Sequence, residues 1–262
     1  MTCVLVTGAS GSIGGAIVRA LTAGGMTATG TARRPAAGEA ALLALDVTDP
    51  ASVVACVDDF VARHGRIDAL VNNAGFDLYG GLEETSWEEF MAQMDTNFFG
   101  AVRMTQAVLP RMRAQGGGRI VNIGSLGGLV GLPLNSAYAA SKFALEGFGE
   151  SLRLELLPDQ IYVSVIEPPA VATETLEQSI REVAATTGPL LARRRAMVPQ
   201  MRAEGRASPV KPEHVAAAVL RALRDPQPLL RYPVGGQARW IPRLKALLPQ
   251  RSFEKSLRGR WP

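Results

Sequence analysis

The start of the chain constrains the fold more than any other stretch. Residues 2–7 form an apolar run typical of a buried strand, residues 8–14 read GASGSIG, and residues 15–23 have a helical pattern. Glycine lets the backbone turn sharply and approach a phosphate at a helix N-terminus. A plain tight turn is the alternative, but a glycine turn between a strand and a helix is the usual setting of a nucleotide site. We therefore expect a nucleotide to bind here.

The alternation of strands and helices continues along the chain. We expect further strands at residues 26–32, 41–45, 68–72, 119–123 and 161–166, and a seventh at 229–232. Helices are expected at residues 49–63, 87–97, 99–115 and 137–157. A kink is expected where Asn97 and Gly100 interrupt the helical pattern. This alternation predicts an α/β fold, a Rossmann-type doubly wound parallel sheet of about seven strands with helices on both faces.

The carboxyl ends of the predicted strands indicate where a ligand binds, because ligands of such sheets lie beyond this edge. Five residues follow predicted strands there, each immediately or after one residue: Gly8, Asp46, Asn73, Ser125 and Pro168. We therefore expect these residues to border a single cleft.

Tyr138 and Lys142 are four residues apart in a predicted helix, so their side chains should share one face. A free tyrosine has a pKa of about 10, and a nearby ammonium would lower that pKa. Such a tyrosine could exchange a proton with a carbonyl or an alcohol oxygen. Ser125, at the end of the strand 119–123, could hold the same oxygen. A surface pair on an amphipathic helix is the alternative, and the expected convergence at the cleft argues against it.

The end of the second predicted strand bears on the choice of nucleotide. It reads Arg33-Arg34-Pro35 and lacks the acid that NAD-selective sites use to bind the ribose hydroxyls. Two arginines could instead bind a 2′-phosphate, although a solvated pair in a loop is the alternative. We expect NADP(H) to be preferred, with NAD(H) as the second choice.

The whole chain reads as a cytoplasmic globular protein. Its 262 residues carry a net charge of +4, and no apolar run approaches the roughly 20 residues that a membrane span needs. A strand pattern begins at Thr2, which leaves no room for a signal peptide. Cys3 and Cys56 lack metal spacing and are expected to be buried and inert. No metal site is predicted.

The basic charge is concentrated in the C-terminal extension, residues 239–262, which holds seven basic residues and one acid. The rest of the chain is therefore not basic, and nucleic-acid binding is not expected. The extension also contains Trp240, Leu244 and Leu247, so it reads as an amphipathic segment. A weak peripheral membrane contact is one interpretation. Packing over the cleft or against a second subunit is the other, and we favour it.

Taken together, these motifs resemble the short-chain dehydrogenase/reductase family from Thr2 to about Thr173. The resemblance includes the glycine turn, Asn72-Asn73-Ala74-Gly75, and the serine with its YxxxK motif. It implies a catalytic set of Asn97, Ser125, Tyr138 and Lys142. In that set the tyrosine exchanges the proton, the serine orients the substrate oxygen and the lysine lowers the tyrosine pKa and holds the nicotinamide ribose. The asparagine positions a water that relays protons.

The resemblance also implies cofactor contacts and a substrate site. The implied cofactor-binding residues are Gly8, Ser10, Ser12, Ile13, Gly14, Arg33, Arg34, Asp46, Val47, Asn73, Ala74, Gly75, Tyr138, Lys142, Pro168, Val171 and Thr173. The expected substrate-binding residues are Ser125, Leu126, Leu132 and Tyr138, with core packing as the alternative for the leucines. The chain departs from the family pattern at Ser12, usually glycine, and at Pro169, which removes a backbone N–H.

We expect a single domain over residues 1–238, in which residues 173–209 form a substrate lid. The run Arg193-Arg194-Arg195 in that segment is expected to be a solvated helix face. The function implied is NADP(H)-dependent interconversion of a ketone or aldehyde and a hydrophobic secondary alcohol, in a homodimer or homotetramer. A non-enzymatic nucleotide-sensing protein and a membrane-recruited scaffold are the alternatives.

Overall fold

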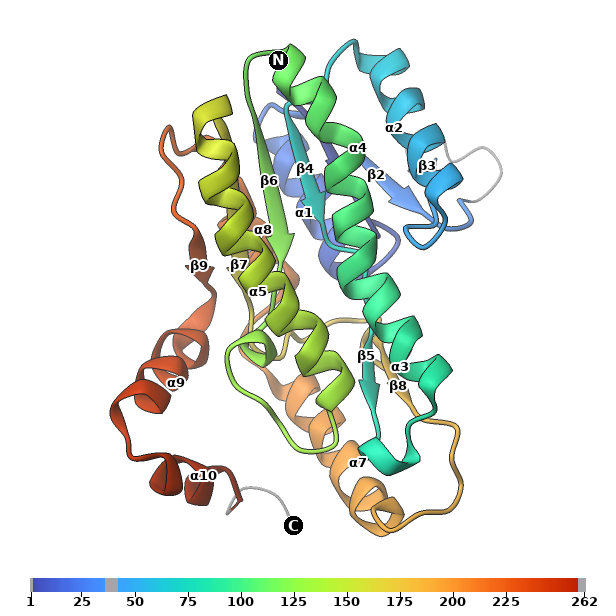
Figure 1. The fold of residues 1–262 in the computed structure, drawn as a ribbon, viewed down its shortest axis with the longest axis vertical. Helices are drawn as coiled ribbons and strands as arrows, with labels where there is room; N and C mark the ends of the chain where they lie inside the picture. Colours follow the sequence, from blue (N-terminus) through green and yellow to red (C-terminus); the bar gives the residue numbers. More distant parts are fainter. Residues whose placement is uncertain (1, 36–41, 259–262) are drawn as a thin grey trace.

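The computed structural model describes residues 2–35 and 42–258, and Figure 1 shows their arrangement. The strands are β1 (Cys3–Val6), β2 (Thr27–Ala32), β3 (Leu42–Ala44), β4 (Ala69–Asn72), β5 (Asp77–Tyr79), β6 (Gly118–Ile123), β7 (Ile161–Glu167), β8 (Ile180–Glu182) and β9 (Arg231–Pro233). The helices are α1 (Ser12–Ala23), α2 (Pro50–His64), α3 (Trp87–Met94), α4 (Gly100–Ala114), α5 (Ser136–Leu156), α6 (Leu176–Ser179), α7 (Leu191–Ala207), α8 (Pro212–Arg224), α9 (Gly235–Leu247) and α10 (Gln250–Arg258).

Seven parallel strands form the central sheet, in the order β3-β2-β1-β4-β6-β7-β9. Every residue of β1 and of β4 is buried, as expected for central strands that helices cover on both faces. The predicted doubly wound α/β fold is confirmed. The third strand was expected to begin at Ala41, which lies outside the described residues, and the last begins two residues later than expected.

Two apolar cores, one on each face of the sheet, hold the layers together. Helices α1 and α8 cover one face, where Ile17 and Leu21 pack against Val215 and Val219. Helices α2, α4 and α5 cover the other face (Figure 1), which contains Phe60 and the methionines of α4. Helix α8 was not predicted, although it completes the first of these cores.

The break predicted between the helices at 87–97 and 99–115 is a π-helical turn over Asp95–Phe99. This turn joins α3 and α4 and leaves only 2% of Asn97 exposed. Single π-turns inside helices occur often at functional sites, because they change the direction of one side chain.

A second, two-stranded sheet lies beside the predicted lid. Strand β5 pairs in parallel with β8, so that Asp77 is opposite Ile180. Strand β8 belongs to the lid segment 173–209, together with α6 and α7. Neither β5 nor β8 was predicted, since strands of three residues are too short to show a periodic pattern.

The expectation that Arg194 is solvated is wrong. This side chain is 4% exposed, whereas its neighbours Arg193 and Arg195 are exposed as predicted. The Arg194 guanidinium lies 3.4 Å from the carboxylate of Glu84 and donates to the carbonyl oxygens of Val183 and Ala185. The arginine is buried because this face of α7 lies against Glu84 and the segment that follows β8.

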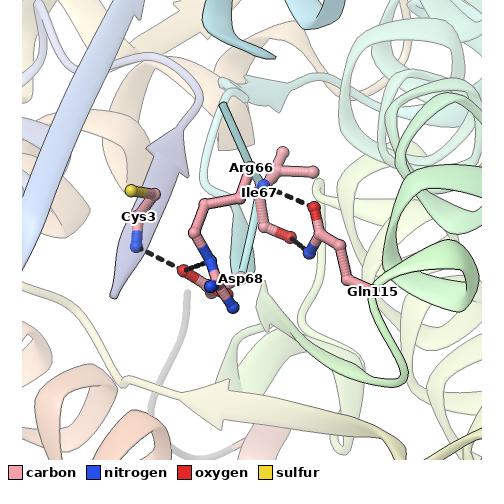
Figure 2. Close-up of polar contacts among 5 residues, drawn as sticks. All are labelled: Cys3, Arg66, Ile67, Asp68 and Gln115. Atoms are coloured by element: carbon pink, nitrogen blue, oxygen red, sulfur yellow. Dashed lines mark hydrogen bonds and ion pairs between the residues drawn. The ribbon is translucent and has the colours of Figure 1, made fainter. Parts of the chain in front are cut away.

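The amino-terminal edge of the sheet is fixed by side chains that bind the backbone (Figure 2). The Asp68 carboxylate accepts from the Cys3 N–H at 2.7 Å and from the Arg66 guanidinium. Across from this pair, the amide of Gln115 accepts from the N–H of Ile67 at 3.0 Å and donates to the Ile67 carbonyl at 2.9 Å. These contacts align the chain that enters β4 with β1 and with the end of α4.

We expect Gln115→Ala to lower the free energy of unfolding by about 1–3 kcal/mol, because the buried Ile67 loses partners for both of its backbone groups. Gln106→Ala on the exposed face of the same helix is the matched control and should change that energy by less than about 0.5 kcal/mol. Urea unfolding of both variants measures the difference. Equal effects would contradict this role of Gln115.

Candidate active site

The four predicted catalytic residues all line one cavity of about 300 Å³, here called the tyrosine cavity. Tyr138 and Lys142 lie one turn apart on α5, Ser125 follows β6, and Asn97 comes from the π-turn. The fold accounts for this convergence, because β6 ends at the edge of the sheet where α4 and α5 begin. Tyr138 therefore faces an enclosed cleft.

Burial has the largest effect on the pKa of Tyr138. It raises the pKa of the phenol, the negative charge of Asp77 raises that pKa further, and a hydrogen bond from Ser125 partly opposes both effects. The net direction is therefore the opposite of the one expected from Lys142 alone. Because the charged phenolate is disfavoured, the phenol is held in its protonated form at neutral pH.

Lys142 is buried and turned toward the sheet. Its Nζ donates to the carbonyl oxygen of Ile123 at 2.8 Å and lies 5.8 Å from the centre of the Tyr138 ring. Burial lowers the pKa of Lys142 to about 8, against the charges of Asp77 and Glu146, which raise it. The ammonium thus carries its charge at neutral pH but loses it in mildly alkaline solution.

Asn97 holds the loop after β4 through hydrogen bonds to both backbone groups of Phe76. Its Oδ1 accepts from the Phe76 N–H at 3.0 Å, and its Nδ2 donates to the Phe76 carbonyl at 2.9 Å. The same Nδ2 lies 3.4 Å from the hydroxyl of Ser141 on α5. Asn97 therefore joins the loop, the π-turn and the helix that carries Tyr138.

A second cavity of about 560 Å³, here called the glycine-turn cavity, adjoins the first. Most of the predicted cofactor residues line it: Gly8, Ser10, Ile13, Gly14, Arg33, Asp46, Val47, Asn73, Ala74, Gly75 and Thr173. Pro168, Val171, Tyr138 and Lys142 line the tyrosine cavity instead. Ser12 and Arg34 line neither cavity.

A dinucleotide fits the glycine-turn cavity on two grounds. Gly8 has φ +68°, and a Cβ there would lie 2.9 Å from the backbone of Ala74, so this position excludes a side chain and the backbone stays open to a ligand. The hydroxyl of Thr173 lines both cavities, is buried, and has no hydrogen-bond partner among the described residues. A ligand that spans both cavities could supply that partner.

The departure at Ser12 has a structural explanation. The Ser12 hydroxyl lies 3.0 Å from the hydroxyl of Thr175 and accepts from the Thr175 N–H at 3.3 Å. It is therefore turned toward the start of the lid, and it ties the glycine turn to that segment. Direct contact with a pyrophosphate, one of the roles expected for Ser12, remains a prediction.

The tyrosine cavity is largely apolar. The predicted substrate residues Leu126 and Leu132 both line it. Sequence analysis missed three ionisable lining residues: Asp77, Tyr79 and Glu204. No motif includes them, and only Asp77 lies close in sequence to a recognised one.

The C-terminal helices form part of the cavity wall, as the favoured interpretation predicted. Gln237 and Ile241 of α9 and Leu257 of α10 line the tyrosine cavity, and Lys245 donates to the carbonyl of Leu129 at 2.7 Å. Trp240 nevertheless remains 63% exposed. Within residues 2–35 and 42–258, no helix combines the length and apolar character required to cross a bilayer.

Comparison with known proteins identifies the family. The short chain dehydrogenase model matches residues 2–184. A 3-ketodihydrosphingosine reductase of Bacteroides thetaiotaomicron is 44% identical over 63% of this chain and 62% of its own length. Human 17-beta-hydroxysteroid dehydrogenase type 1 is 42% identical over 74% of this chain and 60% of its own length. The chain thus spans less than two thirds of these two relatives.

Longer matches lead to the same family. Bovine retinol dehydrogenase 8 is 37% identical over 88% of this chain and 77% of its own length. The crystal structure of a short-chain dehydrogenase from Streptomyces avermitilis superposes with a TM-score of 0.81, at 36% identity, over 98% of this chain and 97% of that one. With its parallel sheet, glycine turn and paired tyrosine and lysine, the chain belongs to the short-chain dehydrogenase/reductase family of oxidoreductases.

Proposed function

We propose that the protein is an NADP(H)-dependent oxidoreductase that interconverts a ketone or aldehyde and a hydrophobic secondary alcohol. The observation that carries this proposal is the position of Tyr138, whose protonated phenol lines an apolar cavity directly beside the glycine-turn cavity. Residues such as Gly75 and Thr173 line both cavities. A ligand in one cavity is thus within reach of a ligand in the other.

The residues of the tyrosine cavity have distinct tasks in this reaction. The bound nicotinamide supplies the hydride, or accepts it in the reverse direction. Tyr138 donates its proton to the carbonyl oxygen during reduction and takes it back during oxidation. Ser125, which hydrogen-bonds to Tyr138, orients the same oxygen. The Lys142 ammonium keeps a positive charge close to the phenol as its proton leaves.

The lining of the tyrosine cavity supports a hydrophobic substrate. Leu126, Val130, Leu132, Ile180 and Met201 lie along its wall, so an apolar chain or ring would be removed from water on binding. Relatives named as a ketodihydrosphingosine reductase, a hydroxysteroid dehydrogenase and a retinol dehydrogenase are consistent with this class.

Arg33 supports the preference for NADP(H). It follows β2 and lines the glycine-turn cavity, whereas Arg34 does not. Arg181 of β8 lines the same cavity, and Arg33 is close enough to lower the pKa of Arg181, after the larger effect of burial. Positive charge at the strand end suits a 2′-phosphate. A neighbour from Burkholderia phymatum in complex with NAD shares the fold at 22% identity, so NAD(H) remains the second choice.

Membrane recruitment is a second candidate role, favoured by one observation. Trp240, Leu244 and Leu247 on α9 are exposed, and Arg239 and Arg243 lie on the same helix. Basic amphipathic helices of this kind bind anionic lipid surfaces. The role is compatible with catalysis, because the same helix also lines the tyrosine cavity.

Tyr138→Phe should lower kcat for ketone reduction at least about 100-fold, because the variant loses its proton donor. Cofactor binding, followed by fluorescence titration, should change little. Tyr162→Phe, on β7 and away from both cavities, is the matched control. Retained turnover in Tyr138→Phe would contradict the proposal, and a wild-type protein that binds cofactor but turns over no carbonyl or alcohol in a broad panel would favour a nucleotide sensor.

Arg33→Ala should weaken NADPH binding roughly 10- to 100-fold and leave NADH binding nearly unchanged, since a charged hydrogen bond contributes about 1.5–3 kcal/mol. Arg34→Ala should have a smaller effect, because Arg34 does not line the cavity. Equilibrium titration of each variant with both cofactors measures the ratio. An equal loss for NADPH and NADH would exclude a 2′-phosphate contact at Arg33.

For ketone reduction, kcat/KM should fall as the pH rises through about 8, because Lys142, with its pKa lowered by burial, then loses its charge. A pH profile of the wild type between pH 6 and pH 10 measures this decline. In Lys142→Arg, the activity that remains should not show it, since a guanidinium stays charged over this range. A wild-type profile that is flat through pH 9 would contradict the assignment.

A further inference from the structure

Asp77 is an ionisable residue of the tyrosine cavity to which no part of the proposed reaction assigns a role. It opens β5, directly after the stretch Asn72-Asn73-Ala74-Gly75 and Phe76, and lines the cavity with Tyr138 and Lys142. Its charge raises the pKa of Tyr138 and opposes the lowering of the pKa of Lys142. Asp77 therefore lies close to the position of the reacting oxygen.

The backbone on both sides of Asp77 is held rigidly by buried amide side chains. Gln93, which has no exposed surface, accepts from the Leu78 N–H and donates to the Phe76 carbonyl, both at 2.9 Å. Asn97 holds both backbone groups of Phe76, as described above. A surface carboxylate would not require this support, whereas a binding group gains from being fixed in advance.

The Asp77 carboxylate itself is fixed by Asn135, whose Nδ2 donates to Asp77 Oδ1 at 2.6 Å and to the Leu78 carbonyl at 3.2 Å. Asn135 is 2% exposed and precedes α5. Tyr79 also hydrogen-bonds to this carboxylate, which lines the cavity. Because each carboxylate oxygen can accept more than one hydrogen bond, the group can still accept from a ligand.

The charge of the tyrosine cavity favours a cation. Its charged lining residues among those described are Asp77, Glu204 and Lys142, and the Lys142 ammonium donates to the Ile123 carbonyl. The remaining lining is largely apolar, which strengthens an electrostatic contact with a bound ligand. An alkyl ammonium combines the two properties that this cavity offers to a ligand, an apolar body and a positive end.

We propose that Asp77 binds a protonated amine of the substrate, close to its reacting carbon, and thereby selects hydrophobic amino ketones or amino alcohols. This inference rests on the proposed function for the reacting group, but the amine contact itself requires no turnover. The positive charge of the amine would also offset the negative charge of Asp77, which raises the pKa of Tyr138. Binding of the amine would therefore lower that pKa.

The test compares octylamine with 1-octanol, two probes of equal chain length, by calorimetric titration of the full chain at pH 7.5. The wild type should bind octylamine at least about tenfold more tightly, as expected for a charge-assisted hydrogen bond. Asp77→Asn, which keeps the shape of the side chain, should bring the two affinities to within about threefold. Glu204→Gln is the matched control for general negative charge and should keep most of the preference.

Equal binding of the two probes to the wild type would overturn the proposal. A preference that persists in Asp77→Asn, or one lost equally in Glu204→Gln, would also overturn it. Because binding is measured without turnover, the result is independent of the Tyr138→Phe experiment. Loss of activity in Tyr138→Phe with no amine preference in the wild type would retain the reaction and reject only the amine contact.

If Asp77→Asn does not fold, the pH dependence of octylamine binding to the wild type still tests the role of Asp77. Burial raises the pKa of Asp77 to about 6, against hydrogen bonds from Asn135 and Tyr79 and the charge of Lys142. The carboxylate is thus ionised above pH 6 and becomes neutral below it, while an alkyl amine stays protonated throughout. The preference for octylamine should therefore decline between pH 7.5 and pH 5, and a constant preference would reject the role of Asp77.

Discussion

The hydrogen bond from the Lys142 ammonium to the Ile123 carbonyl determines where the reactive groups lie. It joins α5 to the end of β6, the strand from which Ser125 follows after a single residue. With the helix fixed at this point, Tyr138 lies one turn away, over the serine. The parallel sheet adds the second requirement, because it brings the glycine turn and this strand end to the same edge. The proposed proton transfer and the proposed cofactor binding therefore depend on one packing arrangement.

Burial has opposite consequences for the three ionisable groups around this bond. It raises the pKa of Tyr138, raises that of Asp77 to about 6, and lowers that of Lys142 to about 8. Each shift disfavours the charged form, as expected where water is excluded. The site at neutral pH thus contains a neutral phenol, an ionised carboxylate and an ammonium. The phenol carries the proton that reduction of a carbonyl would require, but its raised pKa makes it a weaker acid than a free tyrosine.

The sequence alone predicts the sheet and the convergence of Asn97, Ser125, Tyr138 and Lys142, because strand alternation and motif spacing are local signals. It predicts the wrong direction for the Tyr138 pKa, because the Lys142 charge is a local signal whereas burial depends on segments distant in sequence, which line the cavity. The burial of Arg194 and the pairing of β5 with β8 depend on contacts about a hundred residues apart. Asp77 was missed for the same reason, because its support comes from Gln93 and Asn135 rather than from a motif.

The pairing of β5 with β8 connects the predicted lid to the proposed site. Asp77 is the first residue of β5 and is opposite Ile180, so β8 of the predicted lid is paired with the strand that carries the carboxylate. An outward movement of β8 would therefore either break this pairing or move Asp77 with it. Movement of Asp77 would in turn change the electrostatic environment of Tyr138, whose pKa the charge of Asp77 raises.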